Sequence, residues 1–209
     1  MRSLGWAAGA MAVAAVSILS MTAELRVPRQ TDITRLASEQ PLFGLSLRSA
    51  EALLTLCEEQ LAETRIRLLP GNLWRGALVN CRSQAELVTS RWPTEARAWQ
   101  MVAETSARLG EEARFGDAMQ RSQVLAPAVQ WLAQRRLTTA DGYALPDGHS
   151  YDADVRTLLA SDIGARALAR HWLSGDAARR ERIEAGAATA TPGHQARLLD
   201  RVRELAGSQ

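Results

Sequence analysis

Apolar residues recur at intervals of three and four along most of the chain after residue 45, which is the spacing of one face of an α-helix. The pattern is clearest between Pro93 and Pro127. Pro93 suits the first turn of a helix, where its missing N–H is not needed, and Pro127 would end one. Between them, Gly110 stands where glycine commonly ends a helix. We therefore predict an antiparallel hairpin with helices over residues 94–109 and 111–126.

The stretch upstream shows the same spacing, with helices expected over residues 46–68 and 73–92 and a break at Pro70-Gly71. The apolar stripes of these helices put Cys57 and Cys81 on inward faces, almost opposite each other in an antiparallel hairpin. A disulfide there would close a loop of about 25 residues and stabilise the fold by roughly 3 kcal/mol. It would also indicate an oxidising compartment such as a periplasm. The alternative is two buried free cysteines, which are common in helical cores.

Downstream, residues 128–137 are expected to form another helix, with Trp131 facing inward. The segment 138–150 is rich in Gly, Pro, Asp and Thr and is interpreted as a loop. Thr191 is a candidate N-cap for the last helix. The remaining helices are expected over residues 151–160, 163–173, 176–188 and from 192 onward.

Two polar clusters in this part of the chain are interpreted as solvated surface. The aspartates in and around the loop, Asp141, Asp147, Asp152 and Asp154, do not have the spacing of a calcium-binding loop and suit exposed turns. Arg179, Arg180 and Arg182 form a small basic cluster, which is more often a solvated helix face than a ligand site.

The amino terminus has the length of a membrane span. Arg2 precedes an uncharged run from Ser3 to Ala23, and roughly twenty helical residues at 1.5 Å each cross a hydrocarbon core of about 30 Å. We predict an uncleaved signal anchor over residues 1–25, because the small-x-small cleavage pattern is poor. A cleaved signal peptide is the alternative, and either one places the chain from Glu24 onward across the membrane. The inverted orientation, with the helical part in the cytoplasm, stays open. Arg26 and Arg29 follow the uncharged run and offset the positive charge of Arg2 before it, so the flanking charges do not decide the orientation.

Composition predicts an all-α protein. Apolar residues make up 46 % of the chain and aromatic residues 5 %, so the core is built mainly from the helix-favouring Ala and Leu. All 25 basic residues are arginine, and the net charge is only +2 with the two signs interspersed. No basic stripe follows the chain, so we expect no nucleic-acid partner.

The sequence contains no recognisable catalytic motif. A chain without lysine cannot form a G-x-x-x-x-G-K-[ST] phosphate loop, and neither G-x-S-x-G nor H-E-x-x-H occurs. His149, His171 and His194 are too far apart for a local metal-binding pair. The adjacent carboxylates Glu58-Glu59 and Glu111-Glu112 point in different directions on a helix. We expect no catalytic, cofactor-binding or metal site.

The segment around the predicted hairpin resembles a divergent tetratricopeptide repeat. Pro93 and Pro127 are 34 residues apart, which is the period of that repeat. It departs from the repeat at Phe115, where the family has a small residue, and at Ser106, where it has an aromatic one. An unrelated helical bundle is the alternative. The positions that match the repeat core are Trp99, Ala103, Gly110, Met119 and Pro127, followed by Trp131 in the capping helix.

A second resemblance covers residues 46–207. The pair Cys81-Arg82, the segment LAPAVQWLAQRRL, and the C-terminal segments ARALARHWLSGDAARRERI and HQARLLDRVREL look similar to the VpsP-type exopolysaccharide-biosynthesis proteins. Ala126 departs from the glycine expected before Pro127. The resemblance implies an accessory protein, at the inner membrane of a bacterium, in the synthesis or export of a surface polysaccharide.

These observations predict a single-pass inner-membrane protein whose periplasmic part is a non-catalytic adaptor for proteins of a polysaccharide machine. We expect the exposed residues of the helix 94–109 to form the binding face. The alternatives are an enzyme subunit acting on a glycan or lipid-linked sugar, and an assembly factor for another envelope complex. The predicted organisation is an anchor (1–25), a linker (26–45), a tetratricopeptide-like domain (46–138), a loop (139–150) and a C-terminal helical extension (151–209).

Overall fold

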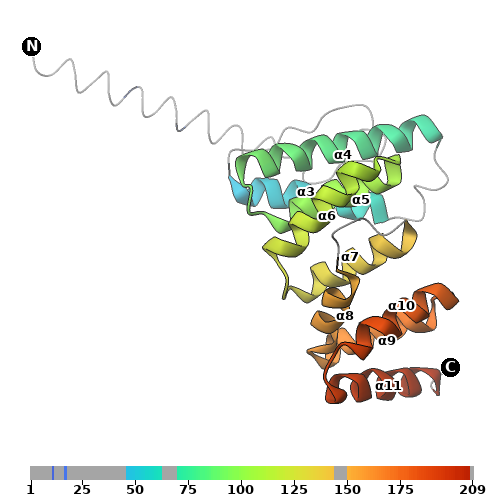
Figure 1. Ribbon diagram of the computed structural model, residues 1–209. Coiled ribbons are helices and arrows are strands. Elements are labelled where there is room, and N and C mark those ends of the chain that lie inside the picture. The colour runs from blue at the N-terminus through green and yellow to red at the C-terminus, as the bar shows by residue number, and fades with distance from the viewer. Residues whose placement is uncertain (1–10, 12–16, 18–45, 63–69, 144–149, 208–209) are drawn as a thin grey trace, which may run out of the picture. The chain divides into compact units, whose positions relative to one another are not determined.

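The computed structural model describes residues 11, 17, 46–62, 70–143 and 150–207, and every regular element in these residues is an α-helix (Figure 1). The predicted all-α class is therefore confirmed. The predicted anchor lies outside the described residues except for Met11 and Ser17, and the predicted linker lies outside them entirely. Within the described parts of the chain, no helix has both the length and the apolar character needed to cross a membrane. The chain forms two compact units, residues 1–93 and 94–209.

The described part of the first unit is a pair of packed helices, α3 (Leu47–Ala62) and α4 (Gly71–Arg91). The helix α3 begins where predicted, because the Ser46 side chain accepts a hydrogen bond from the backbone N–H of Ser49 at 3.2 Å. The helix α4 begins directly after Pro70, two residues earlier than expected. The buried residues of the two helices are Ala50, Leu53, Leu54, Leu56, Cys57, Leu61, Ala77, Leu78, Cys81, Ala85 and Val88.

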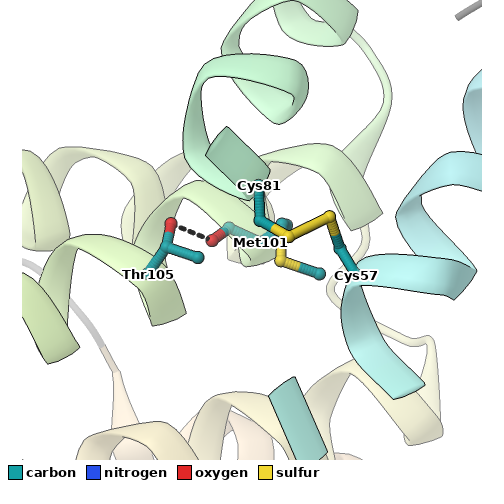
Figure 2. Close-up of a disulfide and its surroundings, with 4 residues drawn as sticks. All are labelled: Cys57, Cys81, Met101 and Thr105. Carbon is teal, nitrogen blue, oxygen red and sulfur yellow. Dashed lines mark hydrogen bonds between the residues drawn. A yellow bond between two sulfur atoms is a disulfide. The ribbon is translucent and has the colours of Figure 1, made fainter. Parts of the chain in front are cut away.

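A disulfide joins these two helices. Cys57 of α3 and Cys81 of α4 are bonded, with their Cα atoms 5.7 Å apart (Figure 2). Both residues are fully buried, on the inward faces where the sequence placed them. The bond ties the middle of α3 to the middle of α4.

The second unit begins with an antiparallel hairpin of α5 (Ala96–Leu109) and α6 (Glu112–Leu125). Gly110 makes the turn with a positive φ of 78°, which a residue with a side chain adopts only with strain. The start of α5 differs from the prediction by two residues. Pro93 and Thr94 form a turn, and the helix starts after Glu95, whose side chain accepts a hydrogen bond from the N–H of Arg97 at 3.2 Å.

The next helix, α7 (Gln130–Gly142), is longer than predicted. The residues 138–142 were expected in a loop but continue the helix, because Thr139 and Ala140 are buried in the core. The hydroxyl groups that favoured a loop are satisfied inside the helix: Thr138 and Thr139 donate to the carbonyls four residues earlier, at 3.0 and 2.9 Å. The part of the predicted loop at residues 144–149 lies outside the described residues.

Four further helices complete the second unit: α8 (Tyr151–Leu159), α9 (Asp162–Leu173), α10 (Ala177–Ala188) and α11 (Pro192–Ala206). The side chains of Ser150, Ser161 and Asp176 cap the first three of them. In Figure 1 they follow α7 as the orange-to-red end of the chain. The helix α8 packs against α7, α9 and α10, and α11 packs mainly against α9. Their shared core consists of Ala133, Leu137, Ala140, Tyr151, Val155, Leu158, Leu159, Ala165, Leu168, Ala169, Ile183, Ala187 and Leu198.

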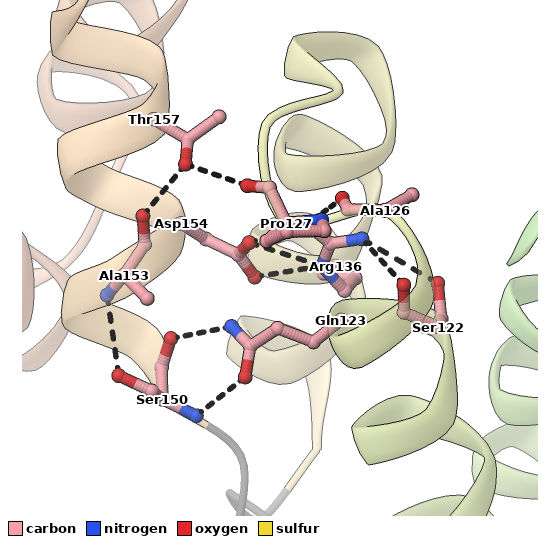
Figure 3. Close-up of polar contacts among 9 residues, drawn as sticks. All are labelled: Ser122, Gln123, Ala126, Pro127, Arg136, Ser150, Ala153, Asp154 and Thr157. Carbon is pink, nitrogen blue, oxygen red and sulfur yellow. Dashed lines mark hydrogen bonds and ion pairs between the residues drawn. The ribbon is translucent and has the colours of Figure 1, made fainter.

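A fully buried ion pair connects α7 to α8 (Figure 3). The Arg136 guanidinium holds both carboxylate oxygens of Asp154, with its Nη2 2.6 Å from Oδ1 and its Nε 2.9 Å from Oδ2. The same guanidinium donates to the carbonyl oxygens of Ser122 and Ala126, each at 3.4 Å. Burial raises the pKa of Asp154 by more than Arg136 lowers it. Because the Arg136 guanidinium contacts Ser122 and Ala126 at the end of α6 as well as Asp154 on α8, it holds α6, α7 and α8 together.

The first turn of α9 comes close to the end of α8 at Gly164. A Cβ atom at Gly164 would lie 2.2 Å from the backbone oxygen of Leu158, and backbone does not move aside as a flexible side chain can. We expect Gly164→Ala to lower the free energy of unfolding by about 1–3 kcal/mol or more. Gly193→Ala in α11 is the matched control, because its Cβ would meet nothing within 4 Å. That change should be neutral or stabilise by up to about 1 kcal/mol. Urea titrations followed by circular dichroism measure both, and equal effects would contradict the close approach.

Candidate functional site

The residues predicted as the repeat core have different environments. Ala103 and Met119 are buried in the α5–α6 hairpin, and Gly110 makes its turn. Trp99 is half-buried, and Pro127 is exposed in the turn after α6.

Trp131 does not face inward as predicted, since 47 % of it is exposed. The buried face of α7 is formed instead by Ala133, Arg136 and Leu137. Trp131 lies one turn from Gln134 and Arg135, which are exposed and half-buried. The helix register therefore turns the indole toward solvent.

The predicted binding face is also corrected. On α5, every side chain from Ala96 to Leu109 is buried or half-buried, so only half-buried residues such as Arg97 and Trp99 reach the solvent. It lies inside the unit because it packs against both α6 and α7.

Exposed apolar side chains gather instead where α6 ends and α7 begins. Val124 is 73 % exposed, and Leu125 and Val129 are exposed beside the turn that contains Pro127. Together with Trp131 they lie within eight consecutive positions of the chain. The signal in the sequence is the apolar run on both sides of Pro127.

Two arginine–tryptophan stacks place the start of α5 beside the end of α6 and the start of α7. The guanidinium carbon of Arg97 lies 5.8 Å from the ring centre of Trp131, and that of Arg121 lies 4.6 Å from the ring centre of Trp99. Each stack joins α5 to a neighbouring helix. We name this region the Trp131 surface, and it consists of Arg97, Trp99, Arg121, Val124, Leu125, Val129 and Trp131.

A second cluster lies further along the unit, around Asp141 near the end of α7. Its side chain is only 1 % exposed. Arg182 Nη2 lies 2.7 Å from Oδ1 and His171 Nε2 lies 2.5 Å from Oδ2. The Tyr151 hydroxyl lies 3.2 Å from both oxygens, and Arg179 Nε lies 3.2 Å from Oδ2 without the geometry of a hydrogen bond. We name these five residues the Asp141 cluster.

The electrostatics of the cluster favour an ionised Asp141. Burial alone would raise the pKa of its carboxyl group, but the hydrogen bonds and charges of His171 and Arg182 outweigh burial and hold that pKa below its usual value. Burial, followed by the charge of Asp141, raises the pKa of the Tyr151 hydroxyl, which therefore stays protonated and donates to the carboxylate.

Asp141 and Asp154 do not lie at solvated turns as predicted, because both carboxylates are buried, and Arg179 and Arg182 are half-buried against Asp141. The helix α7 continues through Asp141, which brings its carboxylate against α8, α9 and α10. Arg179 and Arg182 turn toward it, while Arg180 stacks on Trp172 and donates to the carbonyl oxygens at the end of α9.

Within the described residues, no three histidine, cysteine, aspartate or glutamate side chains come together in a way that would hold a metal ion. His194 lies on α11, away from His171 on α9, and His149 lies outside the described residues. In comparisons with known proteins, neither a family model, nor a curated protein, nor a solved structure matches this chain.

Proposed function

We propose that this protein is a membrane-anchored, non-catalytic adaptor that binds a protein of an exopolysaccharide synthesis or export machine through the Trp131 surface. In this proposal, residues 1–25 form an uncleaved anchor in the bacterial inner membrane, and the helical units lie in the periplasm. The hairpin of α5 and α6 is a divergent tetratricopeptide-like unit, and α7 is the helix that follows it. The polysaccharide pathway rests on the resemblance to the VpsP-type proteins.

The observation that carries the adaptor function is the composition of the Trp131 surface. Protein interfaces are enriched in tryptophan and arginine, and their most important contacts are aromatic side chains surrounded by apolar ones. Trp131 has this setting: its ring is stacked on Arg97, and Val129 is exposed two residues away. A partner that removes these valine and leucine side chains from water gains roughly 25 cal/mol for each Å² of apolar surface, against the cost of association. The surface therefore suits a partner with an apolar segment flanked by acidic side chains.

The disulfide supports the periplasmic location. Disulfides persist in oxidising compartments and are rare in the cytosol. Cys57 and Cys81 are both buried, which protects the bond from reductants in solution. Together with the uncharged run from Ser3 to Ala23, the bond favours export of the helical units across the inner membrane.

Site-specific crosslinking in native membranes tests the proposal. A photo-reactive amino acid at Val124 should give a defined adduct with a component of polysaccharide synthesis or export. Glu112 is the matched control position, because it is exposed at the other end of the same helix and should give no such adduct.

Trp131→Asp should reduce the adduct at Val124 at least about tenfold, because hot-spot side chains contribute about 2 kcal/mol or more. Leu199→Asp is the matched control, since Leu199 is an equally exposed apolar residue on α11 outside the surface. Adducts of equal yield at Val124 and Glu112 would contradict the adaptor function. An adduct with a cell-division or cytochrome-maturation protein would keep the adaptor but overturn the polysaccharide pathway.

A further inference from the structure

We infer that Arg179, Arg182 and His171 of the Asp141 cluster form a binding site for a phosphate group. The inference does not depend on the proposed adaptor function, because it concerns different residues on different helices.

Asp141 acts as the organiser of the site. Its carboxylate comes from α7, and it is contacted by Tyr151 of α8, His171 of α9, and Arg179 and Arg182 of α10. Since the carboxylate is almost fully buried, these contacts hold two guanidinium groups and one imidazole around a single point. Such side chains are fixed before a ligand arrives, which lowers the entropy lost on binding.

The charge of the cluster is not balanced. Arg179 and Arg182 carry two permanent positive charges, and Asp141 supplies one negative charge. Among the residues that the structure describes, neither arginine forms an ion pair with any other carboxylate. The nearby Glu184 accepts a hydrogen bond from the indole of Trp172, and Asp176 caps α10 through the backbone N–H of Arg179. One positive charge therefore remains, at a place that excludes much of the solvent.

The cluster also has hydrogen-bond donors to spare. Arg182 uses Nε and Nη2 on Asp141, and its guanidinium carbon lies 5.8 Å from the ring centre of Tyr151; among the described residues no acceptor pairs with its Nη1. Both Nη groups of Arg179 have no hydrogen-bond partner among the described residues, and its Nε is buried without one. His171 uses Nε2 on Asp141, and its other ring nitrogen, Nδ1, donates to a ligand only when the imidazole carries both protons. The side chains of Arg179 and Arg182 are 25 % and 32 % exposed, so a small ligand can reach these donors from solution.

A purely structural role explains only part of this arrangement. Arg182 alone neutralises Asp141, and Tyr151 and His171 supply the remaining hydrogen bonds. A second arginine at the same carboxylate adds like-charge repulsion, unless an anion offsets it. Guanidinium groups bind phosphate through paired N–H donors, and the three terminal oxygens of a phosphate group can use donors from several side chains at once.

Titration of the purified full-length protein with inorganic phosphate tests the site, against chloride at equal ionic strength. We expect saturable changes in the NMR signals of the Arg179 and Arg182 Nε–H groups, together with a rise in Tm that follows the occupancy of the site. Arg179→Gln should weaken phosphate binding at least about tenfold, which corresponds to 1.4 kcal/mol. Arg203→Gln on α11 is the matched control, because its side chain is exposed and its one ion pair with a described residue is to Asp200, and it should leave binding unchanged.

If Arg179→Gln folds poorly, the NMR signals of Arg179 and Arg182 in the unaltered protein still test the phosphate site. Changes that never saturate, or that chloride or acetate reproduces equally, would overturn the inference. Glucose 1-phosphate compared with inorganic phosphate identifies the source. Tighter binding of the ester indicates a phosphate carried on a larger molecule, and tighter binding of the free ion indicates inorganic phosphate.

Discussion

Replacing Arg136 by leucine is expected to lower the free energy of unfolding by about 3–5 kcal/mol, because the change leaves a buried carboxylate without its counter-charge. Asp154 is 1 % exposed and Arg136 is fully buried. The loss has two parts. Asp154 must remain charged in an apolar interior or take up a proton, and the carbonyl oxygens of Ser122 and Ala126 each lose one of their donors and keep a backbone N–H.

Urea unfolding of the full-length protein, followed by circular dichroism, measures this loss. Arg135→Leu is the matched control on the same helix, because Arg135 is partly exposed and its partner Glu104 keeps a second ion pair with Arg108, so the loss should be only about 1 kcal/mol. The double change Arg136→Leu with Asp154→Leu should recover a large part of the loss, since it removes the unpaired charge. An Arg136→Leu variant as stable as the Arg135→Leu control would contradict a tight ion pair between Arg136 and Asp154.

Removing the disulfide is expected to lower the stability of the α3–α4 pair by about 3 kcal/mol, because the bond limits the freedom of the unfolded chain. Cys57 and Cys81 are separated by 24 positions, and both lie inside the helix pair. The double change Cys57→Ala with Cys81→Ala removes the bond without burying a hydroxyl group. Hydrogen exchange of the α3 and α4 amides, read by mass spectrometry, measures the effect within this unit.

A reductant provides the control for this prediction. Because the bond is buried, the reductant is added to the unfolded protein, which is then refolded in its presence; this treatment should speed the exchange of α3 and α4 in the unaltered protein and have no effect on the double variant. A thiol-reactive reagent should find no free thiol in the unfolded, unreduced protein. Two titratable thiols under those conditions would show that the bond is absent from the native protein.

The helices could be predicted where local signals agree with the packing. Gly110 and Pro127 mark ends that the backbone requires whatever surrounds them, so the α5–α6 hairpin follows from the sequence. The continuation of α7 could not be predicted, because Thr138, Thr139 and Gly142 favour a loop. Burial of Thr139 and Ala140 against the rest of the unit decides this segment, and that contact is not local.

Neither the Trp131 surface nor the Asp141 cluster could be predicted from the sequence, and the reasons differ. The exposure of Trp131 depends on where α7 begins, and a shift of one or two residues moves a side chain from the core to the solvent. The Asp141 cluster joins residues between positions 141 and 182 from four helices. Separately, its aspartate and arginines have the composition of solvated surfaces, and only the packing of α7, α8, α9 and α10 brings them to one point.

Surface polysaccharide measured in a deletion strain tests the central claim, that this protein serves polysaccharide synthesis or export through the Trp131 surface. The strain is complemented in parallel with the unaltered gene, the Trp131→Asp variant and the Leu199→Asp variant, all at equal protein levels. We predict that deletion abolishes the polymer, and that the unaltered gene and the Leu199 variant restore it while the Trp131 variant does not. Unchanged polymer in the deletion strain, grown under conditions of abundant production, would contradict the polysaccharide function. Full restoration by the Trp131 variant would contradict the role of the surface.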